Sequence, residues 1–322
     1  MHVGLVYELQ DEQDIDGTAE FASVYEVGYL AETIEALGHD VTRIGNITQL
    51  VHFLGTGQRV DLVFNYAAGR WGHAREAQVP ALLDAMQIPY TGADAFTLTL
   101  CIDKAIIKRL WRSAGLPTPD FSLVADLNTL SSLPDDLHGF PLFVKPAREG
   151  SSKGIAAASI VATPEALSER VAYLLKAYRQ PVLIERYLSG REFSVGLLGT
   201  GDSTEVLDVV EIQHETIHLV DLAGKKAWGP QTFHPVLDAA LRHELCDLGW
   251  RAYRAVDCQA IGRVDIRMDE AQRPQLLEIN PNPGLHSSRS AMPAIAEQAG
   301  LTYAHLIERL LVQPGLCAMR VP

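Results

Sequence analysis

Apolar and polar positions along the first third of the chain follow two alternating patterns. Short apolar runs are typical of buried strands, and stretches with apolar residues at every third or fourth position are typical of helices. Gly38 stands where the C-terminal cap of the first such helix belongs. Strands that alternate with helices predict a parallel sheet covered on both faces. The expected strands are Val3–Tyr7, Val41–Ile44 and Leu62–Phe64, and the expected helices run over Val24–Leu37, Gln49–Leu54 and Pro80–Met86.

Beyond residue 95 the pattern of apolar and polar positions no longer alternates regularly between strands and helices. The turn at 89–92, Pro-Tyr-Thr-Gly, is expected to end the first unit, and Gly115 is expected to stop the helix that follows. Thr163 and Pro164 predict a further helix, as its N-cap and first-turn proline. The chain is therefore expected to be an α/β protein with mixed α+β character. The other expected elements are helices Ile102–Ala114 and Leu237–Ala255 and strands Phe121–Val124, Leu142–Lys145, Val182–Tyr187, Phe193–Leu198 and Val206–Glu211.

Composition limits the class of protein. The 322 residues are enough for two or three compact lobes. The net charge of −13 argues against nucleic acid or an anionic membrane as a general partner. Four scattered cysteines without a C-x-x-C pair fit reduced thiols, and neither a signal peptide nor a membrane-spanning apolar run is present. We therefore expect a cytoplasmic protein. The cysteines are Cys101, Cys246, Cys258 and Cys317.

The segment 262–284 carries the strongest chemical signal. Asp265 lies in an alternating run that predicts one strand, and Glu278 and Asn280 lie two residues apart in a second run. Side chains at i and i+2 share a face of a strand, so a hairpin would bring the three together. Two carboxylates and an amide oxygen suit Mg²⁺, with substrate phosphates completing its coordination. The alternative is a solvated hairpin with a charged outer face.

A glycine-rich loop follows the expected strand that ends at Lys145. Residues 148–154, Arg-Glu-Gly-Ser-Ser-Lys-Gly, suit a flap whose backbone N–H groups surround phosphate oxygens. The P-loop spacing is absent. Lys145 is placed to reach a phosphate as a point charge. A simple surface turn is the alternative.

The connector 184–193 ends one expected strand and begins the next. Its apolar centre, flanked by Glu185 and Glu192, suits a purine in an apolar slot and a ribose whose hydroxyls need an acceptor. The alternative is two surface glutamates around a turn.

Residues 214–218, His-Glu-Thr-Ile-His, match the zinc-protease signature H-E-x-x-H. That chemistry requires a helix, which brings residues i and i+4 together. The β-branched flanks predict a strand instead, and on a strand His214 and His218 would lie roughly 13 Å apart. We interpret them as two strand histidines.

Together these segments resemble the D-alanine–D-alanine ligase family of the ATP-grasp superfamily, from about residue 89 to the C-terminus. Seven motifs occur in the family's order and spacing. They are IPYTG (88–92), CIDK (101–104), GLPTP (115–119), FPLFVKPAREGSSKGI (140–155), VLIERYLSGREFSVGLLG (182–199), GRVDIR (262–267) and LLEINPNPG (276–284).

The resemblance implies an ATP-grasp fold in three lobes, with ATP between the last two. The lobes are an N-terminal parallel α/β domain (1–95), a central α+β subdomain (96–182) and a C-terminal α+β subdomain with the metal site (183–322). The residues implied to bind ATP are Lys104, Lys145, Ser151, Ser152, Glu185, Tyr187, Leu188 and Glu192. Asp265, Glu278 and Asn280 would hold Mg²⁺, usually two ions, with Mn²⁺ as a substitute, and Arg263, Ser151, Lys225 and Gly284 would serve the chemical step.

The chain departs from the family where amino-acid substrates bind. The glycine-rich segment with Ser-x-Glu is absent, and Thr18-Ala19-Glu20 is a loose substitute. The acidic loop after the third strand is replaced by 68–76, which is rich in cationic and aromatic groups. Lys226 stands in place of a tyrosine, and Arg289 is at or next to the serine that grips the second substrate's carboxylate. The substrate-binding candidates are therefore Glu20, Arg75, Lys226, Arg289 and Ser290.

The resemblance implies an ATP-dependent carboxylate–amine ligase that works through an acyl phosphate on amino acids or small peptides. A genuine D-alanine–D-alanine ligase of peptidoglycan synthesis is the first alternative, and a non-catalytic ATP-binding regulatory protein is the second. Family members are commonly homodimers, so a homodimer is an expectation here.

Overall fold

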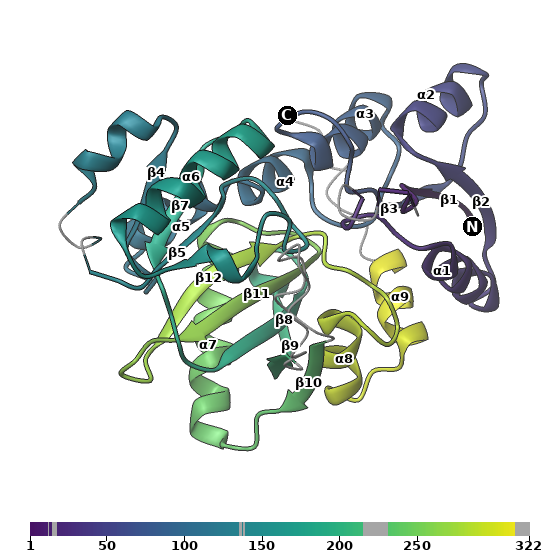
Figure 1. Ribbon diagram of the computed structural model, residues 1–322. Helices are drawn as coiled ribbons and strands as arrows, with labels where there is room; N and C mark the ends of the chain where they lie inside the picture. Colours follow the sequence, from purple (N-terminus) through teal and green to yellow (C-terminus); the bar gives the residue numbers. More distant parts are fainter. Residues whose placement is uncertain (12, 15–17, 135–136, 138, 215–230, 313–322) are drawn as a thin grey trace.

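The structure is a computed structural model, which describes the chain except residues 12, 15–17, 135–136, 138, 215–230 and 313–322. Three sheets with their helices follow one another along the sequence (Figure 1). This arrangement confirms the mixed α/β class. Among the described helices, none has the length and apolarity that a bilayer crossing requires.

The N-terminal unit is the expected parallel sheet. Its strands have the order β2-β1-β3, and β1 pairs in parallel with both neighbours. Helix α1 packs on one face of the sheet, while α2 and α3 pack on the other, so the central strand is buried on both sides. Its elements are β1 (His2–Tyr7), α1 (Val24–Ala36), β2 (Asp40–Gly45), α2 (Ile47–Gly55), β3 (Leu62–Tyr66) and α3 (Gln78–Met86).

The central unit is a four-stranded antiparallel sheet with the order β4-β7-β5-β6. The apolar stripe of α6, with Leu167, Val171 and Leu174, covers one face. Ala105 of α5 packs with Leu183 of β7 on the other. The elements are α4 (Ala95–Cys101), α5 (Lys104–Ser113), β4 (Phe121–Val124), β5 (Leu142–Pro146), β6 (Ile160–Val161), α6 (Pro164–Tyr178) and β7 (Val182–Arg186).

One helix expectation was wrong in this unit. The predicted helix Ile102–Ala114 begins two residues later, after a separate short helix, α4. Asp103 separates the two because its side chain accepts hydrogen bonds from the N–H groups of Ala105 and Ile106, both at 3.1 Å. A residue that caps a helix in this way has extended backbone and lies outside it.

The C-terminal unit is a five-stranded antiparallel sheet with the order β10-β9-β8-β11-β12. On β8, Phe193, Val195 and Leu197 face helix α7, and Gly196 meets α8 on the opposite face. The same alternation places Val264 and Ile266 of β11 toward α7 and leaves Asp265 on the other face. The elements are β8 (Glu192–Leu198), β9 (Glu205–His214), β10 (Gln231–Pro235), α7 (Ala239–Ala255), β11 (Ile261–Met268), β12 (Pro274–Asn280), α8 (Ala291–Gln298) and α9 (Tyr303–Val312).

Candidate active site

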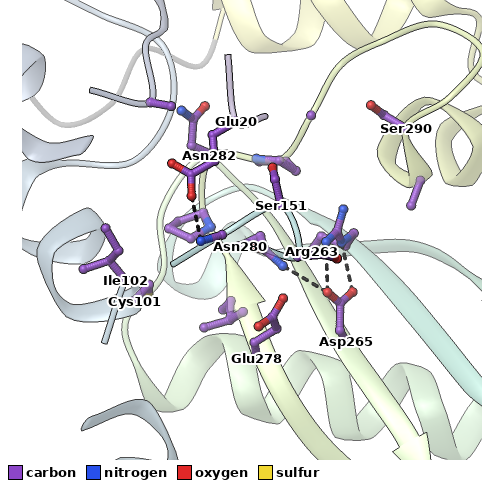
Figure 2. A pocket seen from close by; sticks show the side chains of 18 of the residues that line it. Glu20, Cys101, Ile102, Ser151, Arg263, Asp265, Glu278, Asn280, Asn282 and Ser290 are labelled. Atoms are coloured by element: carbon purple, nitrogen blue, oxygen red, sulfur yellow. Dashed lines mark hydrogen bonds and ion pairs between the residues drawn. The ribbon is translucent and has the colours of Figure 1, made fainter. Parts of the chain in front are cut away.

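The hairpin β11–β12 brings the predicted oxygen ligands together. Asp265 lies directly across from Glu278, and Asn280 pairs with Arg263 in the antiparallel register. Asn280 Nδ2 donates to Asp265 Oδ2 at 3.0 Å, and the Arg263 guanidinium binds both carboxylate oxygens of Asp265 at 2.9 Å (Figure 2). Ser194 Oγ on β8 also donates to Asp265. The predicted convergence of these side chains is confirmed.

Cations set the charge state of this cluster. Burial favours a protonated Glu278, but the nearby charges of Lys104, Lys145 and Arg263 outweigh it and lower the pKa of Glu278 to about 2. Lys104 Nζ lies 3.3 Å from Glu278 Oε2. Burial raises the pKa of Asp265, with Arg263 opposing that shift and Glu278 adding to it. Glu278 is therefore ionised at neutral pH, with cations beside it that compensate its charge.

The donor set of this cluster fits a hard divalent cation. Among the described residues no group of three or more His, Cys, Asp or Glu is placed to hold a metal ion. The cluster at β11–β12 consists instead of two carboxylates and one amide, all oxygen donors of the kind that Mg²⁺ accepts when substrate phosphates complete the shell. Asn280 uses its amide nitrogen on Asp265, which leaves its oxygen available.

The glycine-rich loop lies over the same cavity. Ser151 and Ser152 adopt left-handed backbone with φ of 45° and 58°, a conformation that costs energy for residues other than glycine. The loop is held from below by Lys104, whose ammonium donates to the Glu149 carbonyl oxygen. Arg148 is held by Asp103, with 2.7 Å between Nε and Oδ2. Asp103 therefore both caps α5 and anchors the loop.

Glu20 and Arg75 attach this loop to the N-terminal unit. Arg75 lies in a short 3-10 helix, η1 (Arg75–Ala77), and its Nη2 is 3.1 Å from both carboxylate oxygens of Glu20. The same guanidinium contacts Glu149 Oε2 at 3.3 Å and the Arg148 carbonyl oxygen at 3.2 Å. Glu20 Oε1 also accepts the Gly150 N–H at 2.6 Å (Figure 2). Both candidates lie at the site, but they contact each other and the loop.

These contacts neutralise the charge of Glu20. Lys153 Nζ lies 3.6 Å from its second oxygen, so two cations and one backbone N–H surround the carboxylate. Although burial works in the opposite direction, Arg75 and Lys153 lower the pKa of Glu20. A Cβ on Gly150 would come within 2.9 Å of Glu20 Oε1, so the close approach depends on glycine.

Glu185 is the buried centre of the predicted nucleotide-base region. Its Oε1 atom lies 2.7 Å from Lys145 Nζ, and its Oε2 atom lies 2.9 Å from Lys108 Nζ. Tyr187 stacks on Phe143, with 6.3 Å between ring centroids. Glu192 pairs with Arg267 at 3.3 Å and lies 3.7 Å from His214 Nε2.

Most of the predicted site residues line one cavity of about 420 Å³. Tyr187 and Leu188 line a separate cavity of about 320 Å³. Lys145 and Glu185 are buried between sheets rather than exposed to the larger cavity. The predicted residues that line the larger cavity are Glu20, Lys104, Ser151, Ser152, Glu192, Arg263, Asp265, Glu278, Asn280, Gly284, Arg289 and Ser290.

The segment after β12 forms the far wall of the cavity. Ser290 Oγ accepts the His286 N–H at 3.1 Å, and a Cβ on Gly284 would lie only 2.8 Å from that oxygen. Arg289 Nε donates to His286 Nε2 at 3.0 Å. Its guanidinium forms no ion pair with an acidic side chain in the described parts of the chain and is exposed, so it is available to a carboxylate.

Some predicted residues lie outside the described part of the structure, and some residues at the site were not predicted. Lys225 and Lys226 are in the undescribed segment 215–230, as is His218. His214 is the last residue of strand β9, as expected for its part of the H-E-x-x-H match. The site also contains Lys108, Glu76 and Glu149, which sequence reasoning missed. The signal for Lys108 was its spacing of four residues from Lys104 on one helix face.

Comparison with known proteins gives the family. The model described as "D-ala D-ala ligase C-terminus" matches residues 110–312. A D-alanine–D-alanine ligase of Bordetella petrii is 34% identical over 288 residues, which cover 84% of this chain and 83% of that protein. The chain belongs to the D-alanine–D-alanine ligase family. The uncharacterized protein y4sG of Sinorhizobium fredii is 38% identical over 255 residues, covering 78% of this chain and 73% of that protein.

Solved structures of D-alanine–D-alanine ligases share the fold. The ligase of Bacillus anthracis complexed with ATP has a TM-score of 0.75 at 20% identity and covers 97% of both chains. The VanG D-Ala:D-Ser ligase of Enterococcus faecalis has a TM-score of 0.76 at 20% identity, covering 97% of this chain and 98% of that one. The ATP-grasp fold and the class of an ATP-dependent carboxylate–amine ligase, both expected from the sequence, are confirmed.

Proposed function

We propose that this ligase joins amino acids or small peptides other than two D-alanines. The proposal rests on the contacts that the Glu20 carboxylate already makes. Its carboxylate is already held by Arg75 and the Gly150 N–H, with Lys153 at 3.6 Å, so the ammonium group of a first amino acid would have to compete with these partners. The cavity would therefore recognise its carboxylate donor by other groups, and Arg289 is one cation in its lining.

The chemical step follows from the charges around the cavity. A donor carboxylate attacks the γ-phosphorus of ATP, so ADP leaves and an acyl phosphate forms. The acceptor amine then attacks the acyl carbon, phosphate leaves, and the amine loses a proton as the amide forms. Lys104 and the loop N–H groups at Ser151 and Ser152 would neutralise the phosphates, and Arg263 would neutralise the acyl phosphate and the tetrahedral oxyanion; that these residues line one cavity supports these roles.

Magnesium completes this proposal. Asp265, Glu278 and Asn280 would hold Mg²⁺, or Mn²⁺ in its place, and the bound ion would neutralise the phosphate oxygens during transfer. Their pairing across the hairpin and the low pKa of Glu278 support the assignment. We also propose that the enzyme works in the cytoplasm as a homodimer, because these properties are common in the family.

A screen of substrate pairs tests the proposed function. The protein would be incubated with ATP, Mg²⁺ and pairs of D- and L-amino acids or dipeptides, with phosphate release and product mass as readouts. Glu278→Gln is the control for metal-dependent turnover. We expect product from at least one pair other than D-alanine with itself, and little turnover with D-alanine alone.

The main competing function is a genuine D-alanine–D-alanine ligase. It is favoured by relatives of that name at 32–34% identity. Strong turnover with D-alanine as the sole amino acid would establish it and refute the first proposal. Tight ATP binding without consumption over the whole panel would instead indicate a non-catalytic ATP-binding protein. Arg263 argues against that reading, because it serves the reaction rather than nucleotide binding.

A further inference from the structure

We propose that Arg263 competes with the divalent cation for Asp265, so that the cation binds this carboxylate only by displacing the guanidinium. The inference rests on the proposed function, because it takes Asp265 and Glu278 as metal ligands. It gives Arg263 a second role beside the expected one at the acyl phosphate, and it links the two roles.

Both oxygens of Asp265 are fully used by hydrogen-bond donors of the protein. Oδ1 accepts from Arg263 Nε at 2.9 Å and from Ser194 Oγ. Oδ2 accepts from Arg263 Nη2 at 2.9 Å and from Asn280 Nδ2 at 3.0 Å (Figure 2). An ionised carboxylate has about four lone-pair sites. A cation that binds an oxygen of Asp265 must therefore replace one of these four donors.

The Arg263 guanidinium is the donor that is best placed to move. Ser194 is wholly buried on β8, where the register puts it directly across from Asp265. Asn280 is itself an expected ligand, so its place beside Asp265 suits the cation. The Arg263 side chain is 22% exposed and lines the cavity of about 420 Å³. Its displacement would leave both neutral donors on the carboxylate.

Glu278 differs from Asp265 in its access to a cation. Its side chain is 29% exposed, and among the described residues its polar partner is Lys104, with 3.3 Å between Nζ and Oε2. A cation therefore meets an accessible carboxylate on Glu278, directly across the hairpin from Asp265. Glu278 is then the first ligand, and Asp265 becomes the second once Arg263 gives way.

Displacement of Arg263 would couple the cation to the chemical step. The guanidinium and the cation compete for one carboxylate, but a phosphate has oxygens for both. Away from Asp265, the guanidinium keeps its two parallel N–H donors and fits an oxyanion in the cavity bidentately. By linkage, an anion that binds Arg263 should tighten the binding of the cation, and the cation should tighten the binding of the anion by the same factor.

Titration of the full chain with Mn²⁺ alone tests the inference, with electron paramagnetic resonance reporting the free ion. The readout is the dissociation constant of Mn²⁺, which does not depend on turnover. Because a charge-assisted hydrogen bond corresponds to roughly ten- to hundredfold in an equilibrium constant, we expect Arg263→Met to bind Mn²⁺ roughly tenfold more tightly than the wild type, or better. Asp265→Asn identifies the site and is expected to lose most of the binding.

Two further variants separate occupation of the carboxylate from the general effect of a nearby charge. Arg263→Lys keeps the positive charge but loses the two-point contact, so its affinity should fall between those of the wild type and Arg263→Met. Arg267 lies on the same strand and binds Glu192 and the Gly190 carbonyl oxygen. Arg267→Met therefore removes the same charge without freeing Asp265, and should leave the dissociation constant within about twofold of the wild-type value.

Equal affinities in the wild type and folded Arg263→Met, or equal gains in Arg263→Met and Arg267→Met, would overturn the inference alone. A wild-type dissociation constant in Arg263→Lys would assign any effect to charge and reject the inference too, and this variant decides if Arg263→Met does not fold. Unchanged Mn²⁺ binding in Asp265→Asn, or no binding to any of these proteins, would overturn the proposed metal assignment and this inference with it.

Discussion

Replacing Arg75 by methionine would test how the glycine-rich loop 148–154 is held. Arg75 is 8% exposed and contacts Glu20, Glu149 and the Arg148 carbonyl oxygen. Methionine keeps much of the side-chain volume but removes every polar contact. The side-chain contacts of the loop with the described N-terminal unit would then be those of the Gly150 N–H and Lys153 with Glu20, and that of Arg148 Nη1 with His73 Nδ1 at 3.4 Å.

The expected loss of stability follows from the burial of the Arg75 ion pairs. Removing one partner of a buried ion pair costs about 3–5 kcal/mol. Because Glu20 keeps Lys153 and the Gly150 N–H as partners, we expect a loss at the low end of this range, about 3 kcal/mol. Unfolding entropy of about 2.1 cal/mol/K per residue over 322 residues gives about 0.7 kcal/mol/K, so the melting temperature should fall by roughly 4 °C. Loss of the two loop contacts should raise KM for ATP by about tenfold.

Differential scanning fluorimetry and an ADP-release assay measure these two effects. Arg70→Met is the control, because Arg70 lies in the same segment 68–76 as Arg75 but is exposed, with its guanidinium over the Trp71 ring. Arg75→Met combined with Glu20→Gln should be less destabilised than the sum of the single changes, since both remove one interaction. A melting temperature within 1 °C of wild type and an unchanged KM for ATP would refute the role of Arg75 in holding the loop 148–154.

Three further predictions follow from the site. Glu278→Gln should lower turnover more than about a hundredfold with a native circular dichroism spectrum, because it removes a carboxylate from the oxygen cluster; near-normal Mg²⁺-dependent activity would contradict the metal assignment. Burial, with Glu20 and Glu149 adding to it, raises the pKa of Glu76 from 4.5 to about 7, so its contribution to stability is present at low pH and lost as pH rises through 7. Between pH 4 and 8 the free energy of unfolding of wild type should therefore fall by up to about 3 kcal/mol relative to that of Glu76→Gln. Denaturation of both proteins at several pH values measures this difference, and a difference that does not change with pH would exclude the raised pKa of Glu76. Arg289→Met should raise KM for a carboxylate-bearing substrate by roughly tenfold or more without changing stability, and an unchanged KM would mean that Arg289 only faces solvent.

Local patterns predicted the β11–β12 hairpin correctly. Alternation along a strand depends on covalent geometry, so Glu278 and Asn280 had to share a face once the strand formed. Pairing with Asp265 needed only a short turn between adjacent segments. The same reasoning predicted most strands and helices, and it was wrong about the start of α5 because it overlooked Asp103 as a cap.

Contacts between distant segments were beyond this reasoning. Glu20 was a weak candidate for substrate binding, and nothing in its neighbours indicated that Arg75, fifty-five residues away, neutralises it. Lys108 drew no attention because a lysine on a helix is normally solvated, and its partners come from three separate segments.

The family, the fold class and the residue types available for phosphate and metal chemistry could all be inferred from the chain, since they depend on local periodicity and on motifs in order. Which charges meet depends on folding, because the partners come from distant segments. Whether a carboxylate is free for a ligand or already neutralised depends on the cations that folding places within a few ångströms of it, and on how much water they exclude.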